Sequence, residues 1–254
     1  MNAIIYAAGR ATRLGAAYAH LPKVLLEFGG KTLLEWHALR LAEAGVRKLT
    51  VVTGHCHELV AQEIPRVAKA QGLEIRERFN PDFGEGSVIS LMTSFPDIDE
   101  SAGGFLLMDG DVLYDRGMLQ RLLASQHRSA LLVDFTYSTA DDDPVLVPVL
   151  NGRPFDFMKR WKGTADRVGE SVGFFKISSA DVPLLKAETL ARSVGLGRLD
   201  SMDEVIRALV RAGCLGAEDI TGMAWTEIDF PTDVAYARER ILPQVSGVRA
   251  EVRR

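Results

Sequence analysis

The chain has 254 residues, with 30 basic against 34 acidic residues and a net charge of −4. Its length suits one α/β domain. The basic residues are scattered singly, which excludes the basic stripe of a nucleic-acid binder. No apolar run approaches the ~20 residues of a membrane span, and the first one starts at residue 3 without a basic leader. Only two cysteines occur, Cys56 and Cys214. We expect a cytoplasmic protein with no nucleic-acid or membrane partner, and a homodimer is compatible with these features.

Apolar runs alternate with stretches of helical periodicity through the first 125 residues. Strand–helix alternation produces right-handed crossovers and a parallel sheet with helices on both faces. We therefore predict an α/β fold, a Rossmann-like and mostly parallel sheet, with ligands at the carboxyl ends of its strands. The expected strands are residues 3–8, 49–53, 73–79 and 105–108, and the expected helices are residues 33–44, 58–71, 87–94 and 117–125.

After Asp134 the pattern changes to β segments between turns rich in Asp and Gly. This change predicts a small antiparallel insertion, about residues 138–178, that covers the ligand site. The expected β segments are residues 145–150, 153–161 and 171–177. Two helices, about 179–192 and 201–212, a strand at 224–228 and a helix at about 232–241 follow. We expect one domain over residues 1–245 and a frayed end over 246–254.

The turn after the first expected strand consists of small residues, Ala7, Ala8 and Gly9. Small side chains let the backbone approach phosphate oxygens and a base edge closely. Arg10, Arg13 and Lys23 then bring positive charge to a polyanion. The segment predicts a site for a nucleoside triphosphate, and the alternative is a strand end with unrelated basic residues.

This stretch, together with Pro22-Lys23 and Gly30-Lys31, resembles the signature of the nucleotidyltransferases that join a nucleoside triphosphate to a phosphorylated acceptor. That family includes sugar-1-phosphate, inositol-phosphate and phosphocholine enzymes, and its pattern runs A-A-G-x-G-x-R, P-K-x-L and G-K-P. The chain departs from it at Ala11, where the family has glycine, and at Thr32, where it has proline. The resemblance implies that Arg13 acts on the leaving pyrophosphate and Lys23 on the α-phosphate.

Two carboxylates, Asp109 and Asp111, follow the apolar run 105–108. Residues two apart in an extended chain point to one side, so both could face one divalent cation, for which Mg²⁺ is the expected ion. The alternative is a simple turn. A late segment, Trp225 to Asp229, resembles the W-x-x-hydrophobic-D segment of the same family, which implies that Asp229 meets Asp111 across the site. Strand alternation also places Glu227 on the face of Asp229.

Residues 169–178 resemble a segment of the phosphocholine-type cytidylyltransferases, the branch closest to this chain. Asn80 and Ser90 also match that branch, whereas Gly86 and Ser87 stand where it has paired asparagines. The resemblance implies CTP as the donor and nucleotide contacts from Asn80, Gly86 and Ser87. The departure at Gly86 and Ser87 leaves the acceptor unnamed.

The acceptor is expected to be a small phosphorylated or phosphonate compound. Glu170 could meet a cationic group on it, and Lys159 or Lys162 could approach its phosphate. Trp161 is a candidate wall for a quaternary ammonium, through cation–π contacts worth ~0.5–2 kcal/mol. The remaining candidate walls are Trp225, Tyr114 and Phe174, for which core packing is the alternative.

The implied reaction is nucleotidyl transfer, in which an acceptor oxygen attacks the α-phosphorus and pyrophosphate leaves. The nucleophile is already anionic, so no catalytic Ser, Cys or His is required. A sugar-1-phosphate or inositol-phosphate nucleotidyltransferase using UTP, dTTP or CTP is the runner-up. A non-catalytic nucleotide-binding module is the alternative of another class, and a glycosyltransferase would have no need for Arg13 and Lys23.

Three further motifs have simpler readings. Gly30-Lys31-Thr32 ends like a P-loop, but Leu25 stands at the first glycine position, so a helix start is preferred. His55-Cys56-His57 could chelate a metal, although a surface turn is the more economical account. The acidic run 141–143 suggests a solvated hairpin turn.

Overall fold

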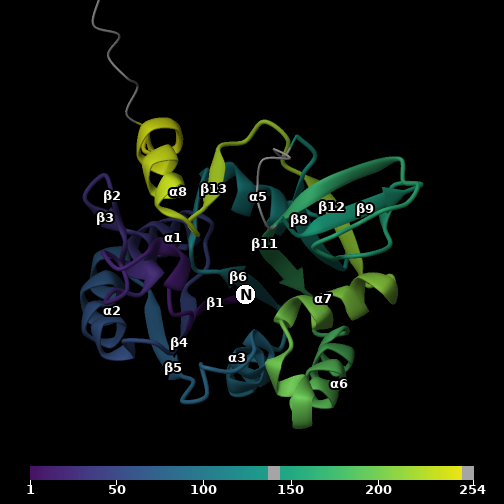
Figure 1. Cartoon of the computed structure of the whole chain (residues 1–254), viewed down its shortest axis with the longest axis horizontal. Helices are drawn as coiled ribbons and strands as arrows, with labels where there is room; N and C mark the ends of the chain where they lie inside the picture. Colours follow the sequence, from purple (N-terminus) through teal and green to yellow (C-terminus); the bar gives the residue numbers. More distant parts are fainter. Residues whose placement is uncertain (137–143, 248–254) are drawn as a thin grey trace, which may run out of the picture.

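A computed structural model describes residues 1–136 and 144–247, and a nine-stranded mixed sheet lies at its centre (Figure 1). The acidic run 141–143, the first part of the predicted insertion and most of the predicted frayed end lie outside the described residues. One path of the sheet runs β10-β9-β11-β6-β1-β4-β5, while β8 pairs with β11 and β12 pairs with β8. The strands are β1 (Asn2–Ala7), β4 (Lys48–Thr53), β5 (Glu74–Phe79), β6 (Phe105–Asp109), β8 (Ser129–Asp134), β9 (Leu146–Leu150), β10 (Arg153–Pro154), β11 (Arg167–Ile177) and β12 (Leu215–Asp219).

The parallel half of the sheet consists of β5, β4, β1 and β6, as the strand–helix alternation predicts. Helices α1 (Leu33–Glu43), α2 (His57–Gln71) and α3 (Ser87–Thr93) lie in its connections. At the start of α1 the Thr32 hydroxyl accepts a hydrogen bond from the Glu35 amide, and the Glu35 carboxylate accepts one from the Thr32 amide. This capping box confirms that Gly30-Lys31-Thr32 begins a helix.

The second half of the sheet corrects several predictions. Strands β8 and β12 were not predicted, and β11 begins at Arg167 rather than at residue 171. The predicted β segment 153–161 is confirmed only in part, because Arg153 and Pro154 pair with β9 and Met158 forms an isolated bridge to Leu146, while no continuous strand joins them. Pro154 has no amide to donate, and ion pairs from Asp156 to Arg207 and Arg211 tie the following residues to α7 (Met202–Arg211).

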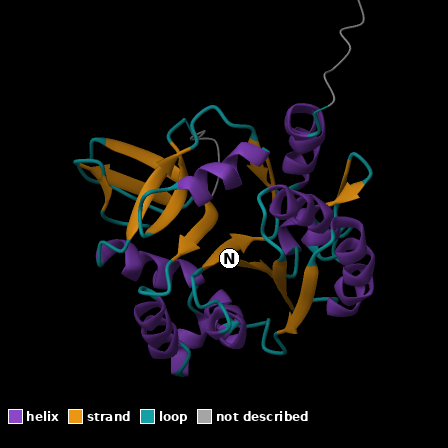
Figure 2. Ribbon diagram, turned by 180° about the vertical axis from the view of Figure 1, so that it is seen from behind, coloured by secondary structure: helices purple, strands orange, loops and turns teal. Residues whose placement is uncertain are grey.

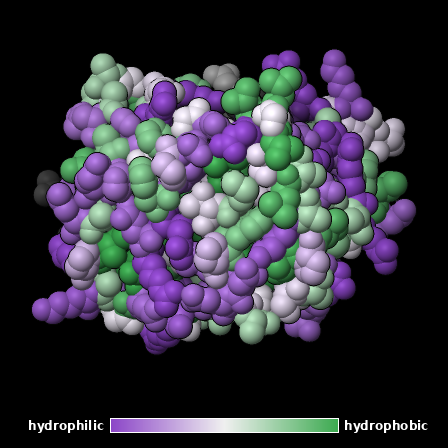
Figure 3. All heavy atoms as spheres, turned by 90° about the horizontal axis from the view of Figure 1, so that it is seen from below, coloured by the Kyte–Doolittle hydropathy of each residue, from purple (hydrophilic) through white to green (hydrophobic). Residues whose placement is uncertain are grey.

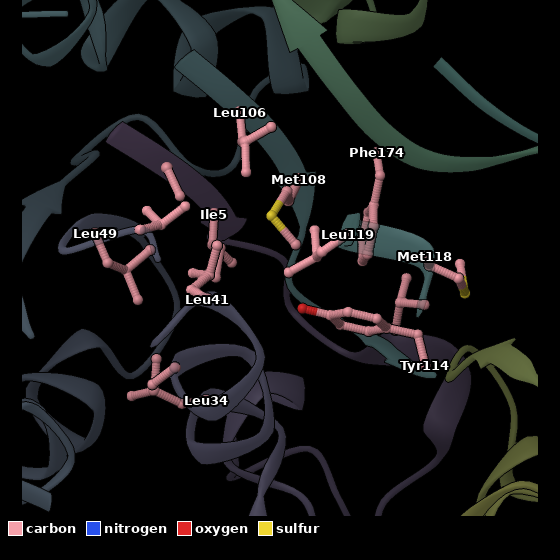
Figure 4. Close-up of a cluster of buried hydrophobic side chains, with 14 of the residues drawn as sticks. Ile5, Leu34, Leu41, Leu49, Leu106, Met108, Tyr114, Met118, Leu119 and Phe174 are labelled. Carbon is pink, nitrogen blue, oxygen red and sulfur yellow. The ribbon is translucent and has the colours of Figure 1, made fainter. Parts of the chain in front are cut away.

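Helices cover both faces of the sheet, which confirms the predicted layering (Figure 2). One core packs α1, α2 and α5 (Arg116–Ala124) against β1 and β6, and Figure 4 shows Ile5 and Met108 beside side chains from α1 and α5. The other core packs α3, α6 (Val182–Arg192) and α7 on the opposite face. The remaining short elements are η1 (Thr12–Leu14), η2 (Lys23–Leu25), β2 (Glu27–Phe28), β3 (Lys31–Thr32), α4 (Phe95–Asp99), β7 (Val112–Tyr114), η3 (Gly195–Leu199) and β13 (Trp225–Glu227).

The chain ends in three helical pieces instead of the single predicted helix at 232–241. These are α8 (Pro231–Tyr236), a π turn η4 (Ala237–Ile241) and α9 (Leu242–Val245). Pro243 has no amide for the carbonyl four residues before it, so a regular turn cannot continue through this point. Ile241 and Val245 belong to a third core that also contains Leu14 and Trp36, and this core holds the N-terminal turn against the C-terminal helices.

No helix among the described residues is long and apolar enough to span a membrane. Cys56 and Cys214 are both free. The face seen from below mixes hydrophilic and hydrophobic residues (Figure 3).

A buried histidine lies beside two aromatic side chains of the first core. His37 of α1 is fully buried and lies against the backbone of Gly110, but neither ring nitrogen forms a hydrogen bond of normal geometry within the described part of the chain. Its ring centroid lies 5.3 Å from that of Tyr114 and 6.1 Å from that of Phe174. Burial lowers the pKa of His37 from 6.5 to about 4, so the folded protein keeps the ring neutral.

We expect His37 to make the fold sensitive to acid. The unfolded chain binds a proton at His37 as the pH falls through 6.5, whereas the folded protein does so only near pH 4. The stability that the neutral ring contributes is therefore complete above pH 6.5 and is lost as the pH falls to about 4, by about 3 kcal/mol. Urea denaturation of wild type and His37→Leu across this range should give diverging pH profiles, and parallel profiles would contradict the assignment.

Candidate active site

The turn that follows β1 carries Arg13 on η1. Ala11, just before η1, adopts a left-handed backbone with φ of 53°. This conformation costs a non-glycine residue about 1–2 kcal/mol, and glycine stands there in the family pattern. The turn is nevertheless fixed, because Ala11 and Leu14 are buried in the third core.

Lys23 lies at the centre of a cluster of opposite charges. It begins η2, and its Nζ donates to Asp111 Oδ2 at 2.7 Å and to Asp229 Oδ1. Arg13 Nη1 donates to the other oxygen of Asp229, at 2.7 Å. The structure thus brings together four predicted site residues from the N-terminal turn, the end of β6 and the end of β13.

The ionisation of the cluster follows from its geometry. Desolvation lowers the pKa of Lys23, but the negative charges of Asp111 and Asp229 outweigh this effect and the pKa rises above its ordinary value. Burial acts to raise the pKa of Asp229, whereas Lys23 and Arg13 together lower it. Both residues are therefore charged at neutral pH, and each stabilises the charge of the other.

Three carboxylates could hold a divalent cation here. Asp111, Glu227 and Asp229 each place one oxygen within 4.8 Å of the others, the one such group among the described residues. Carboxylate oxygens are the ligands that hard cations prefer, so the donor set fits Mg²⁺. The strand alternation that placed Glu227 beside Asp229 is confirmed by this geometry.

Asp109 lies outside this group, although the sequence predicted it beside Asp111. Strand β6 ends at Asp109, and Gly110 and Asp111 form a turn before β7, so the extended geometry assumed for these residues stops between them. Asp109 faces β11 instead, where a Cβ added to Gly173 would lie 1.9 Å from Asp109 Oδ2. Burial, followed by the charge of Asp111, raises the pKa of Asp109.

Asp233 fixes the position of Asp229, a role that the sequence analysis missed. Its Oδ2 accepts hydrogen bonds from the amides of Asp229, at 2.9 Å, and Phe230, at 2.7 Å. The signal was present, since an acidic residue three or four positions after a strand end can cap the start of the next helix.

The predicted nucleotide contacts lie on two neighbouring turns. A pocket opens beside the first turn, lined by Tyr6, Ala7, Gly9, Lys23, Val24, Gly110 and Asp111. The second turn, residues 80–87, follows β5 and is called the base loop below. Arg10 of the first turn stacks on Phe83 of the base loop, 5.4 Å from its centroid.

The side chains of Asn80 and Ser87 form hydrogen bonds with other residues of the protein. Asn80 is buried, its amide donates to Ser90 Oγ at 3.0 Å, and its oxygen accepts from the Asp82 amide at 2.9 Å. Ser87 Oγ accepts from the Met202 amide at 2.7 Å. A nucleotide contact from Asn80 stays a prediction, and its side chain holds the base loop in shape.

The predicted acceptor residues lie on and around β11. Glu170 is buried on this strand, opposite Asp134 of β8. Lys159 and Trp161 follow β10, and the Trp161 ring meets that of Phe155 at 6.0 Å in an edge contact. Their roles stay predictions.

The three other candidate aromatic walls, beside Trp161, separate into two kinds. Tyr114 and Phe174 are fully buried with ring centroids 4.7 Å apart, so they belong to the core, as Figure 4 shows. Trp225 is half-buried, and its Nε1 donates to Asp134 Oδ2 at 2.9 Å.

The His55-Cys56-His57 turn makes local contacts. One ring nitrogen of His55 lies 2.9 Å from the Ala19 carbonyl, while His57 contacts Glu77 at 3.1 Å and stacks on Phe79. These residues join no three-ligand group among the residues that the structure describes. The turn therefore ties the N-terminal turn to β4, which supports the simpler reading.

Comparison with known proteins agrees with this geometry. A family model described as the MobA-like NTP transferase domain matches residues 3–172. The chain is 28% identical to the CMP-5'-(3-aminopropyl)phosphonate synthase of Streptomyces rubellomurinus, over 96% of this chain and 39% of the relative. It is 30% identical to a bifunctional IPC transferase and DIPP synthase of Rubrobacter xylanophilus, over 95% of this chain and 52% of the relative. The chain therefore spans about half, or less, of the length of these two relatives.

A solved structure confirms the predicted fold. The inositol-1-phosphate CTP transferase from T. maritima matches with a TM-score of 0.77, covering 97% of this chain and 96% of that chain at 22% identity.

The charge cluster predicts how the fold responds to loss of Lys23. Lys23→Met leaves Asp111 and Asp229 facing each other without their shared cation, so we expect a loss of about 1–3 kcal/mol of stability in chelator. Mg²⁺ should restore more stability to this variant than to wild type, because the lysine no longer occupies the space between the carboxylates. Denaturant unfolding with and without Mg²⁺ measures both effects.

Arg66→Met is the matched control, since Arg66 also contacts two carboxylates, Glu35 and Glu63, but on the outer helices. Its stability should not respond to Mg²⁺. An equal response of wild type and Lys23→Met would contradict the account of the cluster.

Proposed function

The chain belongs to the MobA-like NTP transferase domain family, and from this membership we propose that it is a cytidylyltransferase that joins CTP to a small phosphorylated or phosphonate acceptor. The observation that carries the proposal is the Lys23–Asp111–Asp229 cluster beside a turn of small residues. This arrangement offers backbone groups and a cation to phosphates, and carboxylates to a metal, within one pocket.

In the proposed reaction an acceptor oxygen attacks the α-phosphorus of CTP. One phosphorus–oxygen bond forms, the bond to the β-phosphate breaks, and pyrophosphate leaves with the bonding electron pair. Lys23 neutralises the α-phosphate, and Arg13 stabilises the charge that develops on pyrophosphate. Arg13 and Lys23 both pair with carboxylates in the protein without a ligand. Binding of the triphosphate would replace these carboxylate partners with phosphate oxygens.

We assign the metal ligands to Asp111 and Asp229, with Glu227 as the third carboxylate. Mg²⁺ bound there would draw electron density from the phosphates and align them. Asp233 supports this site by holding the backbone at Asp229. Asp109 would contact the acceptor side of the site, because it faces Gly173 of β11.

CTP and a phosphonate-like acceptor are supported by two observations. Residues 169–178 resemble the corresponding segment of phosphocholine-type cytidylyltransferases. The Streptomyces relative is named for a CMP-linked phosphonate product. Glu170 and Lys159 are the proposed acceptor contacts, and the insertion that carries them would cover the acceptor. A sugar-1-phosphate acceptor with UTP or dTTP is the second candidate.

The proposal includes a cytoplasmic location, small-molecule substrates and no nucleic-acid partner, and it is compatible with a homodimer. It is supported by free cysteines and by the absence of a basic stripe in the sequence.

Pyrophosphate release tests the proposed reaction directly. The protein is incubated with Mg²⁺, one nucleoside triphosphate at a time, and a panel of phosphocholine, aminoalkylphosphonates, inositol phosphate and sugar phosphates. We expect release with CTP and a small phosphate or phosphonate. Release with sugar phosphates alone would overturn the cytidylyl assignment, and tight CTP binding without any product would favour a regulatory module.

The metal assignment is tested by Asp111→Asn, which keeps the shape of the side chain and removes its charge. Turnover should fall by at least ~10²-fold, because several kcal/mol of charge stabilisation is lost. Asp99→Asn is the control, since Asp99 pairs with Lys186 on the surface. Wild-type turnover of Asp111→Asn at ordinary Mg²⁺ would refute the assignment.

A further inference from the structure

The base loop packs against a segment that lies more than a hundred residues later in the chain. This segment, residues 195–202, consists of η3 and the residues that start α7, and is called the clamp below. Arg198 of the clamp contacts two carboxylates of the base loop. Its Nε lies 2.5 Å from Glu85 Oε2 and its Nη2 lies 3.1 Å from Asp82 Oδ2.

Backbone hydrogen bonds join the same two segments. The Gly86 amide donates to the Arg198 carbonyl at 2.7 Å, and the Val88 amide donates to the Asp200 carbonyl at 3.3 Å. A Cβ added to Gly86 would lie 2.1 Å from the Asp200 carbonyl oxygen. The glycine is therefore required by the clamp, independently of any ligand.

The opposite side of the base loop faces the N-terminal turn. Arg10 stacks on Phe83, and a Cβ added to Gly84 would lie 2.9 Å from Arg10 Nη2. The base loop is thus held between the turn that would bind the triphosphate and the clamp. Its position relative to a nucleotide depends on contacts from both sides.

The negative charges of the base loop indicate the role of Arg198. Asp82 and Glu85 are two carboxylates on a loop that, under the proposed function, lies beside a polyanionic nucleotide. Without a cation they would repel the triphosphate and each other. Arg198 reaches both at once with its forked guanidinium, and because Asp82 is 54% exposed and Glu85 is 34% exposed, solvent screens the pair with Asp82 more than the pair with Glu85.

We propose that Arg198 is a positioning residue for nucleotide binding: it neutralises Asp82 and Glu85 and holds the base loop in its binding conformation. This inference rests on the proposed function, because it assumes that the base loop meets the nucleotide. It predicts an effect on nucleotide affinity with little effect on the chemical step, since Arg198 contacts the loop and not the reacting atoms.

The test is calorimetric binding of CTP and of the other nucleoside triphosphates, together with steady-state kinetics. Arg198→Ala should weaken CTP binding and raise KM about tenfold, the size expected for two partly exposed charge pairs, and leave kcat within about twofold. Arg198→Lys keeps the charge but loses the fork that reaches both carboxylates, so its CTP affinity should lie between those of wild type and Arg198→Ala. Arg76→Ala is the matched control, because Arg76 contacts two carboxylates, Glu74 and Glu100, away from the base loop.

A compensating variant separates neutralisation from general packing. Adding Asp82→Asn and Glu85→Gln to Arg198→Ala removes the unpaired carboxylates, so CTP affinity should recover to within about threefold of wild type. Wild-type affinity in Arg198→Ala would overturn the proposal. A weakened Arg198→Ala that the two added changes fail to rescue would overturn the neutralising role.

Amide hydrogen exchange without nucleotide tests the loop independently of the proposed function. Arg198→Ala should speed exchange at the Gly86 and Val88 amides, and Arg76→Ala should not. If wild type binds no nucleoside triphosphate, the proposed function is wrong and the inference falls with it. If wild type binds CTP but neither exchange nor affinity changes in Arg198→Ala, the function stands and the inference alone is wrong.

Discussion

The structure depends on one electrostatic constraint, the lysine ammonium between Asp111 and Asp229. Carboxylates whose oxygens lie within 4.8 Å of each other repel unless a cation lies between them. In the protein without a bound metal, Lys23 supplies this positive charge to Asp111 and Asp229. A metal bound at the same carboxylates would compete with the ammonium. Under the proposed function, a triphosphate would remove this competition, because it would offer Lys23 new anionic partners. The cluster would then couple metal binding to nucleotide binding through a single side chain.

The fold brings the charged residues of this cluster together from distant parts of the sequence. Parallel strands β1 and β6 end at the same edge of the sheet, so the small-residue turn and Asp111 lie together. The other carboxylate, Asp229, comes from late in the chain and follows β13, which pairs with β7. The third core fastens the C-terminal helices to the N-terminal turn, and Asp233 holds the backbone at Asp229. Loosening any of these supports would separate Arg13 and Lys23 from their carboxylates.

Local patterns predicted most of the parallel half, because periodicity and helix caps involve neighbouring residues, whereas the residues of the cluster were brought together by the family resemblance. Strands β8 and β12 were missed, since they pair with each other across 80 intervening residues and lack alternation. The β segment predicted at 153–161 is interrupted because Pro154 has no amide to donate and Asp156 pairs with arginines of α7, and Met158 alone bridges back to β9 beyond this point. Glu227, and not Asp109, lies with Asp111 and Asp229, because β6 ends at Asp109 and the chain turns before Asp111. The alternation of side chains along a strand does not show where the strand ends. No local pattern indicated the role of Arg198, since its partners Asp82 and Glu85 are distant in sequence.

The measurement that tests the central claim most directly is a crystal structure with a non-hydrolysable CTP analogue and Mn²⁺, whose position anomalous scattering identifies. The account predicts the metal between Asp111 and Asp229, with Lys23 Nζ turned from the carboxylates to the α-phosphate and Arg13 on the terminal phosphates. A nucleotide and metal bound while Lys23 still bridges Asp111 and Asp229 would contradict it.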